Sequence, residues 1–174
     1  MKLEELTTGD RVIGASGLFL LAVSFFNWLG KKPTGPISVD PTTAESKNAW
    51  AFPVTAIAAV IGSVMLLAVV LKLLGANQPT VVGRFSWSQV LALAGVTAFL
   101  LIAIKLAVGP GTWTDVNGHK FTFEQLNQLC RGLNPSCEGV SKTRGLGIIL
   151  GVIAAAGLAI GGYLRTREDM TTSL

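Results

Sequence analysis

Residues 52–74 read FPVTAIAAVIGSVMLLAVVLKLL, and Lys72 is the only charged side chain in this run. A helix of about 20 predominantly apolar residues is long enough to cross the ~30 Å hydrocarbon core of a bilayer. A soluble helix carries an apolar stripe, whereas this segment is apolar on every side. Lipid offers no hydrogen-bond partners, so the segment must be helical to satisfy its own backbone. Residues 52–74 therefore predict a transmembrane helix.

Three further apolar windows of similar length flank this one, at residues 12–29, 90–108 and 146–164. Charged residues make up only 14% of the chain, against about 25% in ordinary soluble domains. No stretch between the windows is long enough to build a separate soluble core. We expect an all-α membrane protein, a bundle of four transmembrane helices that forms one domain over residues 1–174.

The first window has a signal peptide as its alternative interpretation. The residues before it include Glu4, Glu5 and Asp10 instead of a cationic segment, and no small-residue cleavage site follows Trp28. Both features favour a helix that stays in the protein.

Aromatic and charged residues mark the ends of the predicted spans. Tryptophan prefers the membrane–water interface, and the indoles beside the span boundaries are Trp28, Trp50, Trp87 and Trp113. Asp10 is suited to cap the first helix at its positive end. Arg165 and Arg167 follow the predicted fourth span, where cations suit the negative end of a helix.

The connection at residues 109–145 is predicted to be structured. Asn117-Gly118 separates two short β-prone runs, residues 112–116 and 119–123, and this arrangement is the strongest local pattern for a β-hairpin. The earlier connection, residues 30–49, is rich in Pro, Gly, Ser and Thr and has no helix or strand pattern. We expect residues 109–145 to form a small cap and residues 30–49 to be a polar connector.

A short helix is predicted after the hairpin. Thr122 with Gln125 three residues later is a capping-box pattern that opens a helix. The helix is expected to run through Cys130, with Gly132 as its natural stop. Phe123 and Cys130 would then lie on one face together with Leu126.

The only cysteines, Cys130 and Cys137, both lie in this polar loop. A disulfide between them would close the cap in an oxidising compartment. A redox-active pair is the alternative, although membrane disulfide-forming enzymes relay electrons between two cysteine pairs and this chain has one. A metal site would need two more ligands, and His119 is the only histidine. We predict a structural disulfide and an exposed histidine.

An even number of spans puts both termini on one side of the membrane. Lys and Arg are nearly balanced between the two sides, so the positive-inside rule does not decide the orientation. Because disulfides persist outside the reducing cytosol, the cysteine pair predicts an extracytoplasmic loop and cytoplasmic N- and C-termini.

Lys105 lies inside the third apolar window, and an intramembrane charge is by default a candidate functional site. It is about one turn from the end of the span, so its long side chain can reach the headgroups. We interpret Lys105 as a snorkelling residue and a candidate headgroup contact, with transport or specific lipid binding as the alternative.

The fourth window is rich in small residues, which let helices approach closely. We expect them to pack within the bundle, with an oligomer or partner interface as the alternative. The helix-packing residues are Gly147, Gly151, Ala155, Ala159, Gly157 and Gly161.

The sequence contains no phosphate-binding Gly-rich loop, zinc-ligand pattern or nucleophile elbow. The net charge is +4, but the longest basic cluster is Lys31-Lys32, so nucleic-acid binding is not predicted. We expect no cofactor, no metal and no catalytic residues.

Three segments carry a family resemblance: residues 24–28 (SFFNW), residues 48–52 (NAWAF) and residues 157–165 (GLAIGGYLR). Their combination resembles a group of uncharacterised four-helix integral membrane proteins common in actinobacteria. Members of that group typically end the first span with a Leu-Pro-Trp-like element, where this chain has Phe26-Asn27-Trp28. The resemblance implies four spans and a bacterial plasma membrane, and it implies no activity.

Three functions remain open at this point. The first is a non-enzymatic structural or accessory component of the bacterial cell envelope, either in a larger membrane complex or as a homo-oligomer in the lipid bilayer. The second is a small transporter, channel or lipid-binding protein, which usually needs intramembrane carboxylates or broken helices that these windows lack. The third is a thiol–disulfide membrane enzyme.

Overall fold

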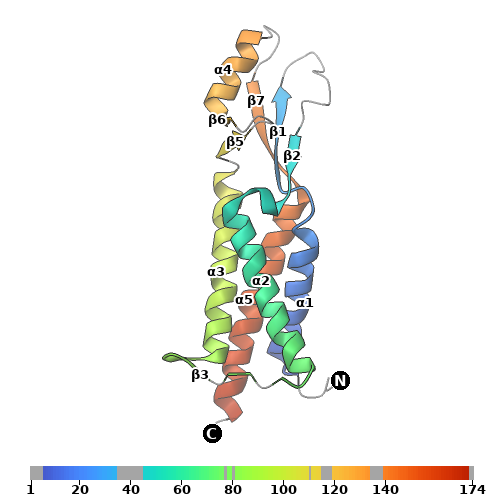
Figure 1. Ribbon diagram of the computed structural model, residues 1–174, viewed down its shortest axis with the longest axis vertical. Helices are drawn as coiled ribbons and strands as arrows, with labels where there is room; N and C mark the ends of the chain where they lie inside the picture. The colour runs from blue at the N-terminus through green and yellow to red at the C-terminus, as the bar shows by residue number, and fades with distance from the viewer. Residues whose placement is uncertain are drawn as a thin grey trace.

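Four long helices lie side by side along the length of the molecule (Figure 1). They are α1 (Thr8–Val23), α2 (Pro53–Leu73), α3 (Trp87–Val108) and α5 (Leu146–Thr172). Each helix packs against two neighbours, in the order α1, α2, α3, α5 and back to α1. The computed structural model describes residues 6–34, 45–76, 78–79, 81–109, 111–114, 119–133 and 139–172. Both chain ends lie at one end of the bundle, which we call the terminal end, and a small cap lies at the other (Figure 1).

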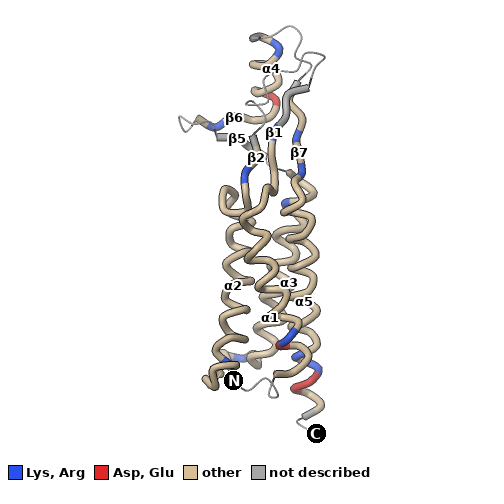
Figure 2. Tube along the Cα trace, turned by 90° about the vertical axis from the view of Figure 1, so that its right-hand side faces the viewer, with Lys and Arg blue, Asp and Glu red and all other residues tan. Residues whose placement is uncertain are grey.

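Three of these helices, α2, α3 and α5, are long and apolar enough to cross a membrane. Charged residues gather toward the two ends of the molecule, and the helices between them are free of charge (Figure 2). Large apolar side chains point outward along this uncharged stretch, and they include Ile57, Val64, Leu93, Leu100, Ile104, Ile153 and Ile160. A soluble monomer rarely exposes so much apolar surface. The arrangement therefore fits a protein embedded in lipid.

The first predicted span, residues 12–29, is wrong in its extent. Helix α1 has 16 residues, which corresponds to a length of about 24 Å. It ends at Val23 because the chain turns back there, and the indole N–H of Trp28 donates to the Val23 carbonyl at 2.7 Å. This bond satisfies one of the carbonyls that a helix end leaves unpaired. A fourth membrane span stays a prediction.

The other long helices also differ from the predicted windows at their ends. Helix α3 begins at Trp87, where Ser86 and Gln89 form a capping box. Helix α5 continues past residue 164 to Thr172, so Arg165 and Arg167 lie within it and do not follow it. The extension is held because α5 stays packed against the start of α1 at this level.

The cap contains a three-stranded antiparallel sheet in the order β2, β1, β7. Its strands are β1 (Leu29–Thr34), β2 (Glu45–Lys47) and β7 (Gly139–Arg144). The prediction that residues 30–49 form no strand is therefore wrong. Strand β1 pairs with β7 over its whole length, from Leu29 opposite Arg144 to Thr34 opposite Gly139. That partner comes from a distant part of the chain, so no local pattern could indicate it.

The predicted β-hairpin is confirmed in its strands. Strand β5 (Thr112–Thr114) pairs with β6 (Lys120–Thr122), and Trp113 lies opposite Phe121. The turn at Asn117-Gly118 lies outside the described residues. A second, shorter hairpin of β3 (Val81–Val82) and β4 (Phe85–Ser86) precedes α3 at the terminal end.

The predicted short helix is α4 (Phe123–Leu133), which ends one residue beyond the predicted stop at Gly132. Its capping box is confirmed, because the Gln125 N–H donates to Thr122 Oγ1 at 3.3 Å and the Thr122 N–H donates to Gln125 Oε1 at 2.9 Å. Phe123 is buried, and Leu126 and Cys130 on the same face are half-buried. Helix α4 thus lays one face on the cap and exposes the other.

Candidate functional site

A buried carboxylate, Asp10, lies at the terminal end of the bundle, in the first turn of α1. Its side chain is fully buried. Oδ1 accepts a hydrogen bond from Arg165 Nη1 of α5 at 2.5 Å, and Oδ2 accepts one from Lys72 Nζ of α2. The backbone N–H of Thr7 also donates to Oδ2, at 3.3 Å. The cap residue of α1 is therefore Thr7 and not Asp10 as predicted, and Asp10 completes the capping box from the third helical position. Asp10 is also an ion-pair partner of two other helices.

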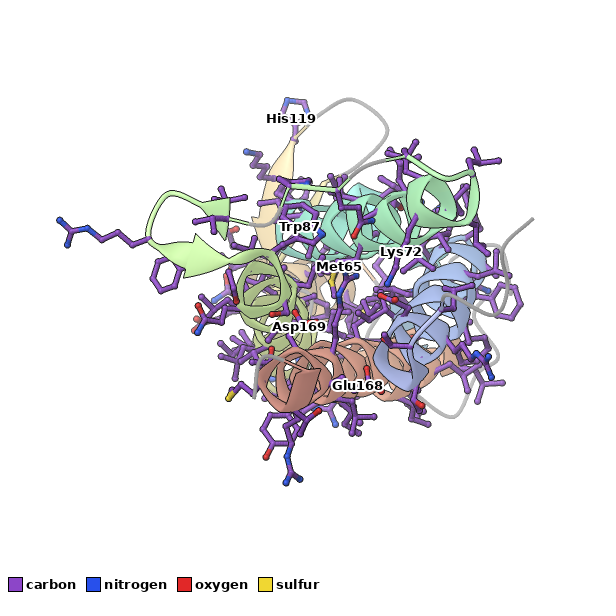
Figure 3. The ribbon with its side chains drawn as sticks, turned by 90° about the horizontal axis from the view of Figure 1, so that it is seen from below. Met65, Lys72, Trp87, His119, Glu168 and Asp169 are labelled. Carbon is purple, nitrogen blue, oxygen red and sulfur yellow. The ribbon has the colours of Figure 1, made fainter. Side chains whose placement is uncertain are left out.

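Gln78 extends this cluster to the fourth helix. Its Oε1 accepts from Arg165 Nη2 at 2.7 Å and from the Trp87 indole N–H at 3.1 Å. Its Nε2 donates to the Ala68 carbonyl of α2 at 2.5 Å. Figure 3 views the molecule from this end, with Lys72 and Trp87 labelled on the bundle. The cluster therefore joins α1, α2, α3 and α5 at the terminal end of the bundle.

A second carboxylate, Glu168 of α5, binds the start of α1. Glu168 Oε1 accepts from the Thr8 N–H at 3.1 Å, and Oε2 accepts from the Gly9 N–H at 3.3 Å. A negative charge is favourable at a helix N-terminus, where backbone donors lack partners. A Cβ added at Gly9 would lie 2.6 Å from the Arg165 backbone nitrogen, so only glycine lets the two helices meet there.

The buried polar atoms of the ion cluster are fully hydrogen-bonded. Among the described residues, no buried side-chain nitrogen or oxygen lacks a hydrogen-bond partner. Asp10 is fully buried and Arg165 is 7% exposed, whereas the Lys72 side chain is 25% exposed. A buried ion pair needs such complete hydrogen bonding to offset the cost of removing its charges from water. The geometry suits a clamp that holds the helix ends together.

This cluster was not predicted from the sequence. Asp10 lies before the predicted window of residues 12–29 but belongs to helix α1, which begins at Thr8. The pattern that could have indicated it is the position of Asp10, Lys72 and Arg165, each at the edge of an apolar run and all on one side of a four-span arrangement. Gln78, in the short connection before α3, has no comparable pattern.

The second structural centre is Trp28, at the junction of the bundle and the cap. It is fully buried, so its ring packs inside the protein and not at the membrane–water interface, where it was predicted. Its backbone N–H donates to Lys47 of β2 at 2.9 Å, and its carbonyl accepts from the Gly145 N–H, just before α5, at 2.8 Å. Trp28 therefore ties α1, the sheet and α5 together.

The predicted packing residues of α5 meet several different partners. A Cβ added at Gly151 would lie 2.7 Å from Trp28 Cη2, and one added at Gly147 would also meet the Trp28 ring. Gly157 and Gly161 face α1, opposite Ser16 and Ile13. Between these positions, Ala155 is fully buried, and the backbone of Ala159 packs against Gly95 of α3. The small residues thus admit an indole at one end of the helix and neighbouring helices elsewhere.

The remaining predicted site residues lie apart from the cluster. The Lys105 ammonium lies over the ring of Phe52, 4.9 Å from its centroid, near the cap end of the bundle. His119 is exposed at the start of β6. Cys130 lies in α4, but Cys137 lies outside the described residues, so the disulfide stays a prediction. The described residues include no group of acidic, histidine or cysteine side chains that could hold a metal ion.

The cap carries a surface cavity of about 490 Å³ on the exposed face of α4. Its lining mixes apolar and amide side chains, and it comprises Phe121, Gln125, Gln128, Leu129 and Gly132. Leu129 is 46% exposed there. The described part of this lining is an exposed mixture of apolar and amide side chains, which is a composition that suits a contact surface.

No protein family model matches this chain, and no curated protein is significantly similar to it.

Proposed function

We propose that this chain is a non-enzymatic integral membrane protein that crosses the bilayer four times and serves as a structural or accessory component of the bacterial cell envelope. The observation that carries the proposal is the continuity between bundle and cap. Strand β1 follows α1 and strand β7 leads into α5, and these two strands pair along six residues. The cap is thereby an extension of the α1–α5 helix pair.

This continuity suits a protein that presents a surface outside the membrane. A cap joined through paired strands and a buried indole cannot swing freely, so its position relative to the bilayer is defined. Helix α4, which carries the cavity, lies at the end of the molecule opposite the termini (Figure 1). A rigid, membrane-anchored contact surface is the property that an accessory subunit of a larger complex needs.

The proposed orientation places the cap outside the cytoplasm and both termini inside, in the plasma membrane of a bacterium. Cys130 and Cys137 form the proposed disulfide, which an oxidising compartment would preserve. The resemblance to the actinobacterial four-helix group supports the same location. The lipid bilayer is the first partner, and a second copy or another membrane protein is the second.

A small transporter, channel or lipid-binding protein is the second candidate, and the Asp10 cluster is the observation that favours it. Ionisable groups within membrane helices commonly mark transport pathways. The cluster lies at the end of the bundle, however, whereas transporter sites usually lie near the bilayer midplane. A thiol–disulfide enzyme rests on the cysteine pair alone and is third.

The deciding experiment is purification in mild detergent followed by identification of what remains bound. A stoichiometric protein partner that is lost in Leu129→Glu and retained in Lys120→Glu, an exposed position outside the cavity, supports the accessory role. A lipid or ion that is bound by the original chain and lost in Asp10→Asn, while circular dichroism shows that the variant is still folded, supports the second candidate, and bound quinone supports the third. A monodisperse, partner-free protein would contradict the accessory role.

A further inference from the structure

The short hairpin β3–β4 projects sideways from the terminal end of the bundle (Figure 1). Seen along the bundle, its strands reach outward beyond the ring of helices (Figure 3). Val82 lies opposite Phe85 in the register, so these two side chains share one face. Val81, Val82 and Phe85 are 59%, 44% and 51% exposed. A hairpin this small gains little from such exposed apolar side chains in water.

The tip of the hairpin combines a tight turn with a cation. Gly83 has a φ of 65°, a conformation that glycine adopts without strain, and Arg84 follows it. Arg84 is exposed and makes no ion pair with any described residue. An arginine beside apolar side chains at a membrane surface suits the phosphate of a lipid headgroup, which guanidinium binds through two parallel hydrogen bonds.

The level of the hairpin along the bundle is set by α3. Helix α3, which is long and apolar enough to span a membrane, begins at Trp87, directly after β4. Ser86 caps this helix, because its Oγ accepts a hydrogen bond from the Gln89 N–H at 3.3 Å. In turn, Gln89 Oε1 accepts one from the Ser86 N–H at 3.0 Å. The charged residues of the terminal end gather at the same level (Figure 2). The hairpin therefore lies at the border between the uncharged stretch and the charged end.

We propose that the β3–β4 hairpin is a lipid-binding element. It inserts Val82 and Phe85 into the leaflet nearest the termini and places Arg84 against the phosphates of anionic headgroups. This rests on the proposed membrane topology. Lipid is the occupant because the exposed apolar hairpin directly precedes α3, a candidate membrane span whose Leu93 and Val96 are also exposed. Four strand residues are also far too few for a stable protein interface, which buries about 800 Å² per partner.

The test measures the depth of a nitroxide spin label attached at Val82→Cys, with Cys130 and Cys137 replaced by Ser. The protein is reconstituted in vesicles of phosphatidylcholine and phosphatidylglycerol. The label at 82 should collide more with oxygen, which partitions into lipid, than with a water-soluble nickel chelate. Asp169→Cys, on the exposed end of α5, should show the opposite preference. Leu93→Cys, exposed on α3, should report a deep lipid position.

The outcomes separate the two proposals. If the label at 93 is in water, the membrane topology itself is wrong. If the label at 93 is in lipid and the label at 82 is in water, only the lipid-binding hairpin is wrong. A label at 82 that reaches neither reagent would indicate a protein contact, such as a second copy, and would also overturn the proposal.

A second measurement leaves the cysteines unchanged. Lipids that stay with the purified protein are quantified for the original chain, Arg84→Gln and Arg84→Lys. Each cation near an anionic surface contributes an attraction that corresponds to about a fivefold change in affinity. Arg84→Gln should therefore retain about fivefold less phosphatidylglycerol, and Arg84→Lys should retain most of it. Equal retention in all three proteins would contradict the role of Arg84.

Discussion

Asp10 is the residue on which the terminal end of the bundle depends. Its carboxylate is the only anion bonded to the buried Arg165 guanidinium among the described contacts. Removing one partner of a buried ion pair leaves the other charge uncompensated in a low-dielectric interior. The clamp should therefore be far more sensitive to a neutral substitution at Asp10 than to the loss of an exposed charge nearby.

Asp10→Asn tests this expectation. The change keeps the size of the side chain but leaves Arg165 without its anion, so it should lower stability by about 3–5 kcal/mol. Thermal unfolding in detergent measures the effect. Asp169→Asn is the matched control, because Asp169 is exposed near the same end of α5, and it should leave the melting temperature unchanged. Similar melting temperatures for both variants would mean that the buried cluster does not hold the bundle.

Gly151 provides a second test at the scale of one residue, because a single added methyl group would meet the Trp28 ring at 2.7 Å. Gly151→Ala should lower stability by about 1–3 kcal/mol through overpacking. Gly132→Ala is the control, since a Cβ at Gly132 of α4 has no neighbour within 4 Å. That variant should be neutral or slightly stabilising, because alanine favours a helix over glycine. A destabilised Gly132→Ala with an unaffected Gly151→Ala would contradict the packing around Trp28.

At the scale of elements, the cap is held by two kinds of connection. Paired strands β1 and β7 join it to the bundle, and the Val140 N–H donates to Asn127 Oδ1 of α4 at 2.6 Å. The Lys142 ammonium also lies 5.1 Å from the Phe123 ring centroid. Helix α4 therefore rests on β7. The proposed disulfide would stabilise the C-terminal half of α4.

Cys130→Ser should loosen the cap and leave the bundle intact. Closing a loop this short contributes about 2.5 kcal/mol in the loop-closure model, which matters for an element with little core of its own. Limited proteolysis with mass spectrometry should find faster cleavage within residues 129–140 of the variant. Thermal unfolding of the bundle should be unchanged. Equal cleavage rates in the original chain and the variant would indicate that no disulfide constrains this loop.

For the whole molecule, the decisive property is that both termini lie at one end and the cap at the other (Figure 1). If the bundle crosses the membrane along its length, as proposed, the cap and the termini lie on opposite sides of it. Exposed apolar side chains cover the helices between them, as expected where lipid is the solvent. Under the proposed four-span topology, the orientation is defined by whether the cap or the termini face the cytoplasm.

Labelling of intact cells with a membrane-impermeant maleimide determines which side of the membrane the cap faces. If the cap is extracytoplasmic and its cysteines are joined, labelling should occur only after treatment with an impermeant reductant. A single cysteine introduced at exposed Asp169, with Cys130 and Cys137 replaced by Ser, should react only after the membrane is permeabilised. The reverse pattern, with reactive cap thiols only after permeabilisation, would place the cap in the cytoplasm.

Local patterns in the amino-acid sequence were enough to predict several elements of the fold. The apolar runs located α2, α3 and α5, because a membrane span requires an uninterrupted apolar surface. The Thr122 and Gln125 capping box located α4, and the β-prone runs around Asn117-Gly118 located the β5–β6 pair. In each case the interacting residues are close along the chain.

Only the tertiary structure decided the end of α1, the cap sheet and the Asp10 cluster. Trp28 stops α1 by folding back under a glycine face of α5, and β1 becomes a strand because β7 pairs with it. Asp10, Lys72, Gln78 and Arg165 meet only when four helix ends converge. Each of these features joins residues that are far apart in sequence, and burial and hydrogen bonding between distant residues leave no periodic pattern to read.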